Sequence, residues 1–187
     1  NLKSLNLKKN KKLKHLYCFN NKIKKLDLTK NTKLEEIYCD NNKLKSINLS
    51  KCVKLKSVTL TGNLIQKLNL KKLKNLRLLG CENCGLRSIS VKYNKKLDCL
   101  DVSKNKKLTT LYIENTKIKM LNLKNNPLIT DLQCNNSSLI SGNLHITYSR
   151  FEDTESQTYS NNYVTYENQK ATLKVKKIGK YYYIPIT

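Results

Sequence analysis

Seven cysteines and two histidines are the side chains of this 187-residue chain that could support redox, metal or general-base chemistry. Cys81 and Cys84 have the spacing at which paired thiolates bind zinc or cycle between dithiol and disulfide. His15 and His145 are the histidines, and imidazole is the side chain that acts as a base near neutral pH. Whether such a site exists depends on which of these side chains point into the core.

A repeat of 21 residues sets those directions. The segment LYCFNNKI at residues 16–23 returns in related form at residues 37–44, 58–65 and 79–86. A second kind of segment lies between these copies, at residues 26–31, 47–52, 68–73 and 89–94. Each unit is therefore made of a ten-residue A half, often Leu-x-Cys-x-x-Asn, and an eleven-residue B half, Leu-x-Leu-x-x-Asn.

Thirteen half-units cover residues 5–141. The B halves begin at Leu5, Leu26, Ile47, Leu68, Ile89, Leu100 and Leu121, and the A halves begin at Leu16, Ile37, Val58, Leu79, Leu111 and Leu132. Alternate residues of an extended segment point to the same side, so both apolar residues of Leu-x-Leu enter the core. The Asn then turns the chain and bonds to backbone groups that the bend leaves unpaired.

This pattern resembles the leucine-rich repeats, and its alternation of ten and eleven residues resembles the nested bacterial class called IRREKO. The resemblance implies a leucine-rich repeat solenoid of the right-handed β/α superhelix class, β-rich with little or no α-helix. Because leucine-rich repeat proteins generally act as binding scaffolds, it also implies a non-catalytic protein-protein interaction module. A bacterial surface or secreted protein, with an extracellular location, is the corresponding expectation.

We expect two parts, a solenoid over residues 1–141 and a degenerate last coil with a Tyr-rich β cap over residues 142–187. The second part holds seven of the eleven tyrosines. Residues 171–176 alternate as a strand does, and Gly179-Lys180 separates them from residues 181–186, which predicts a C-terminal β-hairpin. Because the chain begins inside a repeat, we expect the natural protein to continue upstream.

The repeat predicts structural roles for most of the cysteines. Four occupy the second inward position of A halves, namely Cys18, Cys39, Cys81 and Cys134, and Cys52 and Cys84 occupy the turn position otherwise held by Asn. Only Cys99 lies outside this scheme. We expect free thiols that fill the core, about 5 Å apart on adjacent coils, with no metal and no cofactor. A disulfide and a zinc site remain the alternatives.

The histidines do not form a catalytic pattern either. His15 ends a B half at a position where Glu36, Ser57 and Thr110 stand in other copies, which predicts a solvated side chain. The sequence has no Ser-His-Asp order, His-Glu-x-x-His motif, paired-carboxylate site or phosphate loop. We therefore expect no enzymatic activity from this segment.

The charge of the chain is strongly positive. Thirty-seven Lys and Arg residues face thirteen Asp and Glu residues, for a net charge of +24, and only three of the basic residues are arginines. Lysine runs at residues 8–14, 71–74 and 104–107 fall in the connections between strands. They form either a solvated rim or a track for anionic polymers such as a cell-wall polymer, a sulfated glycan or nucleic acid. No apolar run approaches the ~18 residues that cross a membrane.

The outward residues of the A halves form the candidate binding face. They are Tyr17, Phe19, Tyr38, Asp40, Thr59, Thr61 and Glu82, whereas the B halves present plain polar residues. Aromatic residues exposed on a rigid sheet are typical hot spots of protein interfaces. We expect a monomer that binds a protein of unknown identity through this face. The alternative is that Tyr17, Phe19 and Tyr38 pack beneath an upstream cap.

The alternation of halves breaks once, where the B half at Ile89 is followed by another B half at Leu100. A solenoid still turns once per coil, so the half at Leu100 should take the place of an A half. Tyr112 and Glu114 should then lie beside Ser90 and Lys92, and the A-half face should continue as Asp101, Ser103, Asn122 and Lys124. This exchange requires the two halves to be nearly equivalent in geometry.

Overall fold

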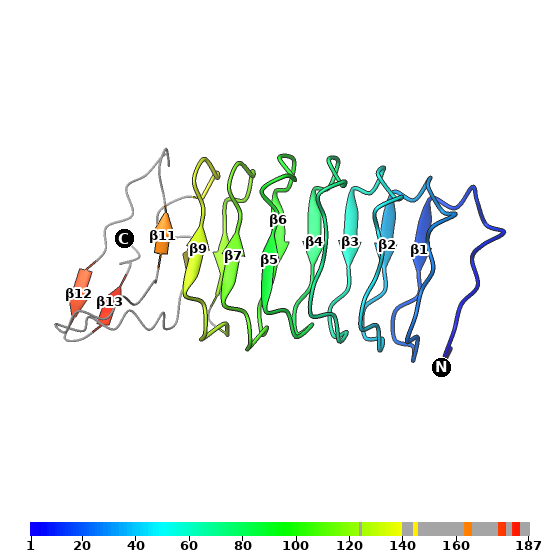
Figure 1. Ribbon diagram of the computed structural model, residues 1–187, viewed down its shortest axis with the longest axis horizontal. Helices are drawn as coiled ribbons and strands as arrows, with labels where there is room; N and C mark the ends of the chain where they lie inside the picture. Colours follow the sequence, from blue (N-terminus) through cyan, green and yellow to red (C-terminus); the bar gives the residue numbers. More distant parts are fainter. Residues whose placement is uncertain (124, 140–143, 146–162, 166–175, 179–180, 184–187) are drawn as a thin grey trace.

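The computed structural model describes residues 1–123 and 125–139, together with four short strands at 144–145, 163–165, 176–178 and 181–183. These residues form a solenoid of short parallel strands, with no helix among them (Figure 1). The predicted β-rich leucine-rich repeat architecture is therefore confirmed.

The first sheet contains five parallel strands from successive coils, in the order β1-β2-β3-β4-β6 (Figure 1). The strands are β1 (His15–Tyr17), β2 (Glu36–Tyr38), β3 (Ser57–Thr59), β4 (Leu78–Gly80) and β6 (Cys99–Asp101). In each strand the middle residue is buried, and it is the first apolar residue of a half-unit. The apolar periodicity of the repeat therefore sets the register of this sheet.

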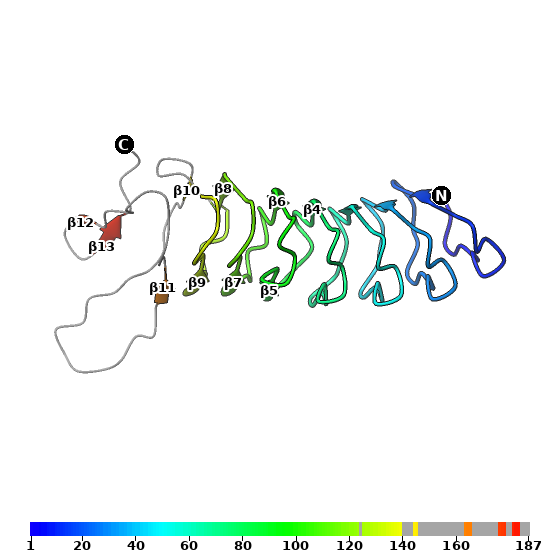
Figure 2. The ribbon, with the colours of Figure 1, turned by 90° about the horizontal axis from the view of Figure 1, so that it is seen from above.

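The second sheet lies on the opposite side of the solenoid (Figure 2) and has the order β11-β9-β7-β5. Its strands are β5 (Ser88–Ser90), β7 (Thr110–Tyr112), β9 (Asp131–Gln133) and β11 (Tyr163–Thr165). The B halves at Leu26, Ile47 and Leu68 form no strand, so this sheet begins only at β5. The two halves are therefore less alike than the sequence suggested.

The break in the alternation is accommodated as predicted. Leu100 pairs with Leu79 of the A half before it, and Leu111 pairs with Ile89 on the opposite side. Asn105, although it comes from a B half, donates to the carbonyls of Cys81 and Val102, the pattern of an A-half Asn. The half at Leu100 thus fills the place of an A half.

The exchange of halves has a local conformational cost. Among the described residues, positive φ angles occur at Asn20, Asn41, Gly62, Asn83, Gly85, Lys104, Asn115 and Asn136. Lys104 is the one residue of that set which is neither Asn nor Gly, with φ of 57°. It precedes Asn105, so the B half acquires an A-type turn only by placing a lysine in the left-handed region, which Cβ disfavours.

The core is a single column of apolar side chains between the two sides of the solenoid. Leucine and isoleucine supply most of it, and Leu34, Leu55, Leu76, Leu97 and Leu108 are completely buried. Turn residues at one position of each coil are buried as well, and they include Asn42, Asn63 and Asn105. Each of these amides donates to backbone carbonyls of its own and the preceding coil, which forms the predicted ladder.

Four short strands, β10 to β13, come after residue 139. β10 (Leu144–His145) pairs in parallel with β8 (Leu121–Asn122), and β11 pairs in parallel with β9. β12 (Lys176–Ile178) and β13 (Tyr181–Tyr183) pair antiparallel, as a hairpin in this region requires. Residues 171–175 and 184–186 of the predicted hairpin lie outside the described residues, and the division at residue 141 stays a prediction.

Candidate functional site

In β1 and β2 the residues on both sides of the buried one reach solvent. The predicted face contains only the residue after the buried one, such as Tyr17 and Tyr38. The strands show that the residue before it also points outward, which adds His15 and Glu36 to the face. Because side chains alternate along a strand, the residues one position before and one position after the buried residue point to the same side. This alternation would have predicted that His15 and Glu36 belong to the face.

Stacked aromatic rings dominate the β1 end of this face. The rings of Tyr17 and Tyr38 are 5.1 Å apart between centroids with an interplanar angle of 18°, and the His15 ring stacks on Tyr17 at 6.5 Å. Tyr17 is 58% exposed and Phe19 is 52% exposed, while Tyr38 is half-buried. The strand register holds Tyr17 beside Tyr38, so the stack is positioned by the backbone.

Glu36 forms hydrogen bonds with two of the rings in this cluster. The Tyr17 hydroxyl donates to Glu36 Oε2 at 2.8 Å, and His15 Nδ1 lies 3.1 Å from the same oxygen. The hydrogen bond to the carboxylate raises the pKa of Tyr17, and the bonds from Tyr17 and His15 lower the pKa of Glu36. His15 is exposed, as predicted, but its ring has partners that the sequence did not reveal. Hydrogen bonds and stacking therefore restrain the aromatic side chains.

Asp40 accepts two hydrogen bonds from the neighbouring coil, in the part of the face that follows the aromatic stack. The Thr59 hydroxyl donates to Asp40 Oδ2 at 2.6 Å, and the Thr61 N–H donates to Asp40 Oδ1 at 2.8 Å. All three residues are half-buried. The structure thus brings together the predicted residues from Tyr17 to Thr61 on one continuous surface, with the aromatic ones at the β1 end.

The remaining predicted positions lie farther along the same sheet. Glu82 pairs with Lys104 Nζ at 2.6 Å, and Asp101 is paired with Gly80, so the A-half face continues onto β6 as predicted. β8, which includes Asn122, contacts β6, whereas Lys124 lies outside the described residues.

On the second sheet, Tyr112 pairs with Ser90 as predicted, and Lys92 Nζ lies 5.8 Å from the Tyr112 ring centroid. The Tyr112 hydroxyl donates to Asp131 Oδ2 at 2.5 Å. In the same way, the Tyr17 hydroxyl donates to Glu36 of the following coil. The break in alternation therefore moves one Tyr-carboxylate pair to the opposite side of the molecule.

The thiols belong to the core, as predicted. All cysteines are free, and Cys99 alone is exposed. Cys18 Sγ and Cys39 Sγ lie 2.8 Å apart, closer than the strand spacing suggested. Burial raises the pKa of Cys52 and Cys134 to about 11, which disfavours the thiolate that binds metals and attacks disulfides. No group of three or more metal-ligating side chains occurs in the described part of the chain.

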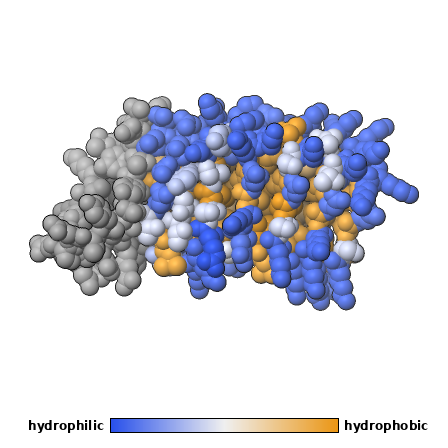
Figure 3. Space-filling model, in the orientation of Figure 1, coloured by the Kyte–Doolittle hydropathy of each residue, from blue (hydrophilic) through white to orange (hydrophobic). Residues whose placement is uncertain are grey.

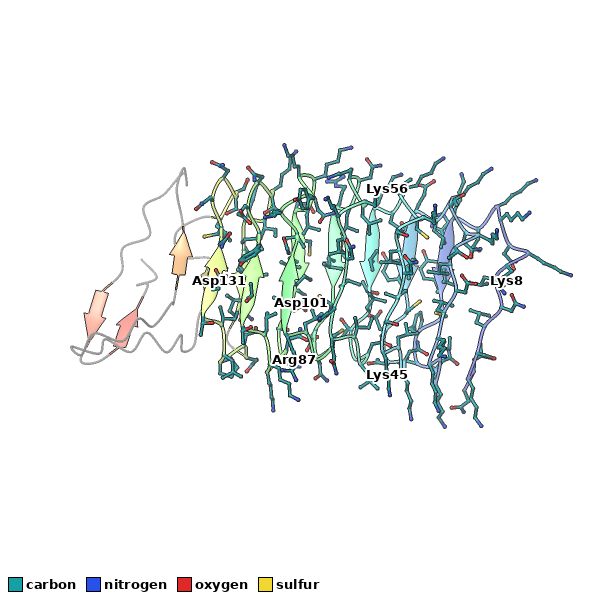
Figure 4. The ribbon with its side chains drawn as sticks, viewed as in Figure 1. Lys8, Lys45, Lys56, Arg87, Asp101 and Asp131 are labelled. Atoms are coloured by element: carbon teal, nitrogen blue, oxygen red, sulfur yellow. The ribbon has the colours of Figure 1, made fainter. Side chains whose placement is uncertain are left out.

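The basic side chains gather at the turns rather than on the strands. Figure 4 shows Lys56 at one end of the strands and Lys45 and Arg87 at the opposite end, whereas Asp101 and Asp131 lie along the strands. In the view of Figure 3, hydrophilic surface covers both long edges of the array and apolar surface appears between them. The positive charge thus forms two rims that flank the sheets.

The comparisons with known proteins agree with this architecture. Residues 11–51 match the family model described as Leucine Rich repeats (2 copies). The functional domain of InlJ from Listeria monocytogenes, which includes a cysteine ladder, is 30% identical with a TM-score of 0.52. The match covers 74% of this chain and 33% of that one, so this chain spans about a third of that domain. None of the curated proteins compared with the chain matches it.

Two further solved structures are similar at lower identity. An internalin (inlF) from Listeria monocytogenes is 21% identical over 73% of this chain and 43% of its own, with a TM-score of 0.49. A leucine-rich repeat protein from Leptospira interrogans is also 21% identical, over 74% and 46%, with a TM-score of 0.40. The described residues include no helix that could cross a membrane. The chain is a leucine-rich repeat protein, with repeats like those of bacterial leucine-rich repeat proteins.

Proposed function

We propose that this chain is a protein-binding module of a bacterial surface or secreted protein, and that it binds through the β1 end of the first sheet. The observation that carries this proposal is the exposed Tyr17–Tyr38 stack, with ring centroids 5.1 Å apart on paired strands. Aromatic side chains that are held in place lose little entropy on binding, which is why they dominate interface energetics. Phe19 and the His15–Glu36 pair supply an apolar and a polar flank.

The internalin-like neighbours support a general interaction role, because leucine-rich repeat scaffolds typically bind rather than catalyse. The carboxylates at Glu36, Asp40 and Asp101 interrupt the basic surface along this face, so the face differs in charge from the lysine-rich rims. A partner with an apolar patch and basic or hydroxyl groups at its rim would match it. This face favours a protein over an anionic polymer, which the acidic residues would repel.

The test is retention of proteins from candidate host-cell surface extracts on the immobilised chain, compared with a Tyr17→Ala/Tyr38→Ala variant. The matched control is Tyr93→Ala, which removes an exposed tyrosine that lies on no strand of the first sheet. We expect the double variant alone to lose the bound protein, and binding to persist at about 0.5 M NaCl, where exposed charges are screened. Equal retention by all three proteins, or loss of binding in salt, would instead support the anionic-polymer alternative.

A further inference from the structure

A hollow of about 320 Å³ opens at the edge of the second sheet, far from the Tyr17–Tyr38 stack in sequence. Residues 67–71 of a B half form one wall, β5 forms the other, and Tyr93 closes one end. We call it the Tyr93 hollow. Leu70 and Ile89 in its walls are buried, so its base is apolar and its rim is polar.

The hollow exists because β5 has no strand on one side. β5 pairs with β7 only, and the Val91 N–H donates to the Tyr112 carbonyl in that direction. Backbone groups alternate in direction along a strand, so the N–H groups of Ser88 and Ser90 face the 67–71 wall. In the first sheet the corresponding N–H of Leu78 donates to the Lys56 carbonyl at 3.1 Å. In the described part of the chain, Ser88 and Ser90 have no such acceptor.

Ser90 also departs from the B-half pattern. In the preceding B half the side chain of Asn69 accepts from the N–H two residues on, that of Lys71, at 3.1 Å. Asp27 and Asn48 do the same in their own halves. At the equivalent position, the Ser90 hydroxyl is buried and has no hydrogen-bond partner among the described residues. The wall of the hollow therefore holds a buried, unsatisfied hydroxyl, and the unpaired N–H groups of Ser88 and Ser90 lie in the same wall.

Three lysines surround the Tyr93 ring, and Lys71 among them lines the hollow. The Nζ atoms of Lys71, Lys74 and Lys92 lie 5.2, 4.9 and 5.8 Å from the centroid of the Tyr93 ring. The ring attracts each ammonium group weakly and so concentrates like charges at the end of the hollow. None of the three lysines forms an ion pair within the described residues.

Acidic groups near this cluster are few. Glu114 takes the position next to Lys92 in the following coil, on the side away from the hollow, and the two form no ion pair. Residues 67–71 and 88–90, which form the two walls, contain no Asp or Glu. The site thus combines a net positive charge with hydrogen-bond donors that lack acceptors.

We propose that the Tyr93 hollow binds a tetrahedral oxyanion, a phosphate or sulfate, carried on a group the size of one sugar ring. A tetrahedral anion presents several acceptor oxygens at once, which suits the N–H groups of Ser88 and Ser90 and the ammonium group of Lys71, all from residues that line the hollow. The volume exceeds what an ion alone would fill and reaches the lower range of small-ligand pockets. This site is separate from the proposed protein-binding face and does not depend on it.

The probe is glucose 6-phosphate, titrated into the ¹⁵N-labelled full chain at about 150 mM NaCl, with glucose and inorganic phosphate as separate arms. We expect saturable shifts of the Ser88 and Ser90 amide signals with glucose 6-phosphate and none with glucose. Equal affinity for inorganic phosphate would contradict the sugar-sized part of the proposal and leave a site for the free oxyanion alone. Weaker binding of inorganic phosphate would support a sugar-linked ligand.

Two variants test the assignment. Lys71→Gln/Lys74→Gln should weaken binding roughly ten-fold or more, because it removes the charge-assisted donor Lys71 from the wall and a second positive charge beside the Tyr93 ring. Ser90→Asn should abolish binding, because the longer side chain fills the hollow and takes the Lys92 N–H. The matched control is Lys8→Gln/Lys11→Gln, the same two positions three repeats earlier, which should bind as the wild type does. The proposal is overturned if the control loses as much affinity, or if shifts spread over all lysine-rich turns without saturation.

Discussion

At the scale of single residues, the cysteines show how one residue type can be inert at most positions and reactive at one. Cys99 is exposed at the edge of β6, whereas the other six thiols are buried. Burial raises the pKa of Cys84 to about 11, so that thiol is protonated as well as inaccessible at neutral pH. Position in the repeat, rather than the spacing of Cys81 and Cys84, determines the chemistry.

We therefore expect one of the seven thiols to react promptly with a disulfide reagent such as DTNB at pH 8, and all seven to react after denaturation. A Cys99→Ser variant should lack the fast reaction while it keeps six slow thiols. Absorbance of the released thiolate counts the reacted groups directly. Two or more fast thiols in the native protein, or fewer than seven after denaturation, would contradict free core cysteines.

Lys104 is the one described residue other than Asn and Gly with a positive φ angle. Its φ of 57° corresponds to the position that Asn20, Asn41, Asn83, Asn115 and Asn136 occupy in other turns. Lys104 also pairs with Glu82, and solvent screens such an exposed pair, so that it contributes little to stability. The strain and the ion pair therefore oppose one another and must be separated.

In a Glu82→Gln background, which removes the ion pair, Lys104→Asn should raise the free energy of unfolding by about 0.5–1 kcal/mol, because Asn tolerates the left-handed region better than Lys. Lys30→Asn is the matched control, since Lys30 precedes the turn Asn of an ordinary B half and has no positive φ. Urea denaturation measures both. A gain of the same size in the control would show that the effect has nothing to do with backbone strain.

At the scale of the repeat element, the turn asparagines differ between A and B halves. Asn63 donates to the Cys39 and Leu60 carbonyls and accepts from the Leu44 N–H. Asn94 donates to two carbonyls as well, but its Oδ1 is buried without a partner. The same residue type thus satisfies one more buried backbone group in an A half than in a B half.

Asn63→Ala should accordingly destabilise the solenoid by about 1–3 kcal/mol more than Asn94→Ala, because it alone leaves a buried N–H without an acceptor. Both asparagines are buried and lie in the middle of the array, so the two substitutions remove similar packing contacts. Equilibrium unfolding followed by circular dichroism gives the two differences. Equal destabilisation would mean that the Leu44 N–H finds another partner.

The repeat period predicted most of the buried residues, although Leu5, Ile47 and Leu68, which begin B halves, are only partly buried. It also predicted the exchange of halves at Leu100, since both half-units place two apolar residues inward at the same spacing. It could not predict that the B halves before β5 lack strands. Strand pairing depends on the contact between neighbouring coils, where side chains such as Asn69 bond locally to the backbone. The His15–Glu36 contact was missed for a similar reason, because those residues are 21 positions apart and meet only through the register of β1 and β2.

At the scale of the whole molecule, the charge of +24 is distributed along an extended array rather than neutralised. Three ion pairs of lysine or arginine are present in the described part of the chain, Lys56 with Glu35, Arg77 with Asp98 and Lys104 with Glu82. Most lysines at the rims therefore repel one another. Such repulsion opposes the compact state and is screened by salt.

We expect the midpoint of thermal unfolding to rise when NaCl is increased from about 10 mM to about 0.5 M at pH 7, and to rise more at pH 3. In the folded chain, the hydrogen bond and charge of Lys56 lower the pKa of Glu35. Hydrogen bonds from Tyr17 and from Thr29 lower the pKa values of Glu36 and Asp27, respectively. Their stabilisation is fully present above the unfolded pKa, near 4, and is lost as pH falls through the folded pKa.

Acidification thus weakens these interactions and increases the net positive charge, since the acidic residues lose their charge as the pH falls. A midpoint that is insensitive to NaCl at both pH values would show that the spacing of the rims already dissipates the repulsion. In that case the excess of positive charge would not change the free energy of unfolding. It would affect only the binding of ligands to the lysine-rich rims and to the Tyr93 hollow.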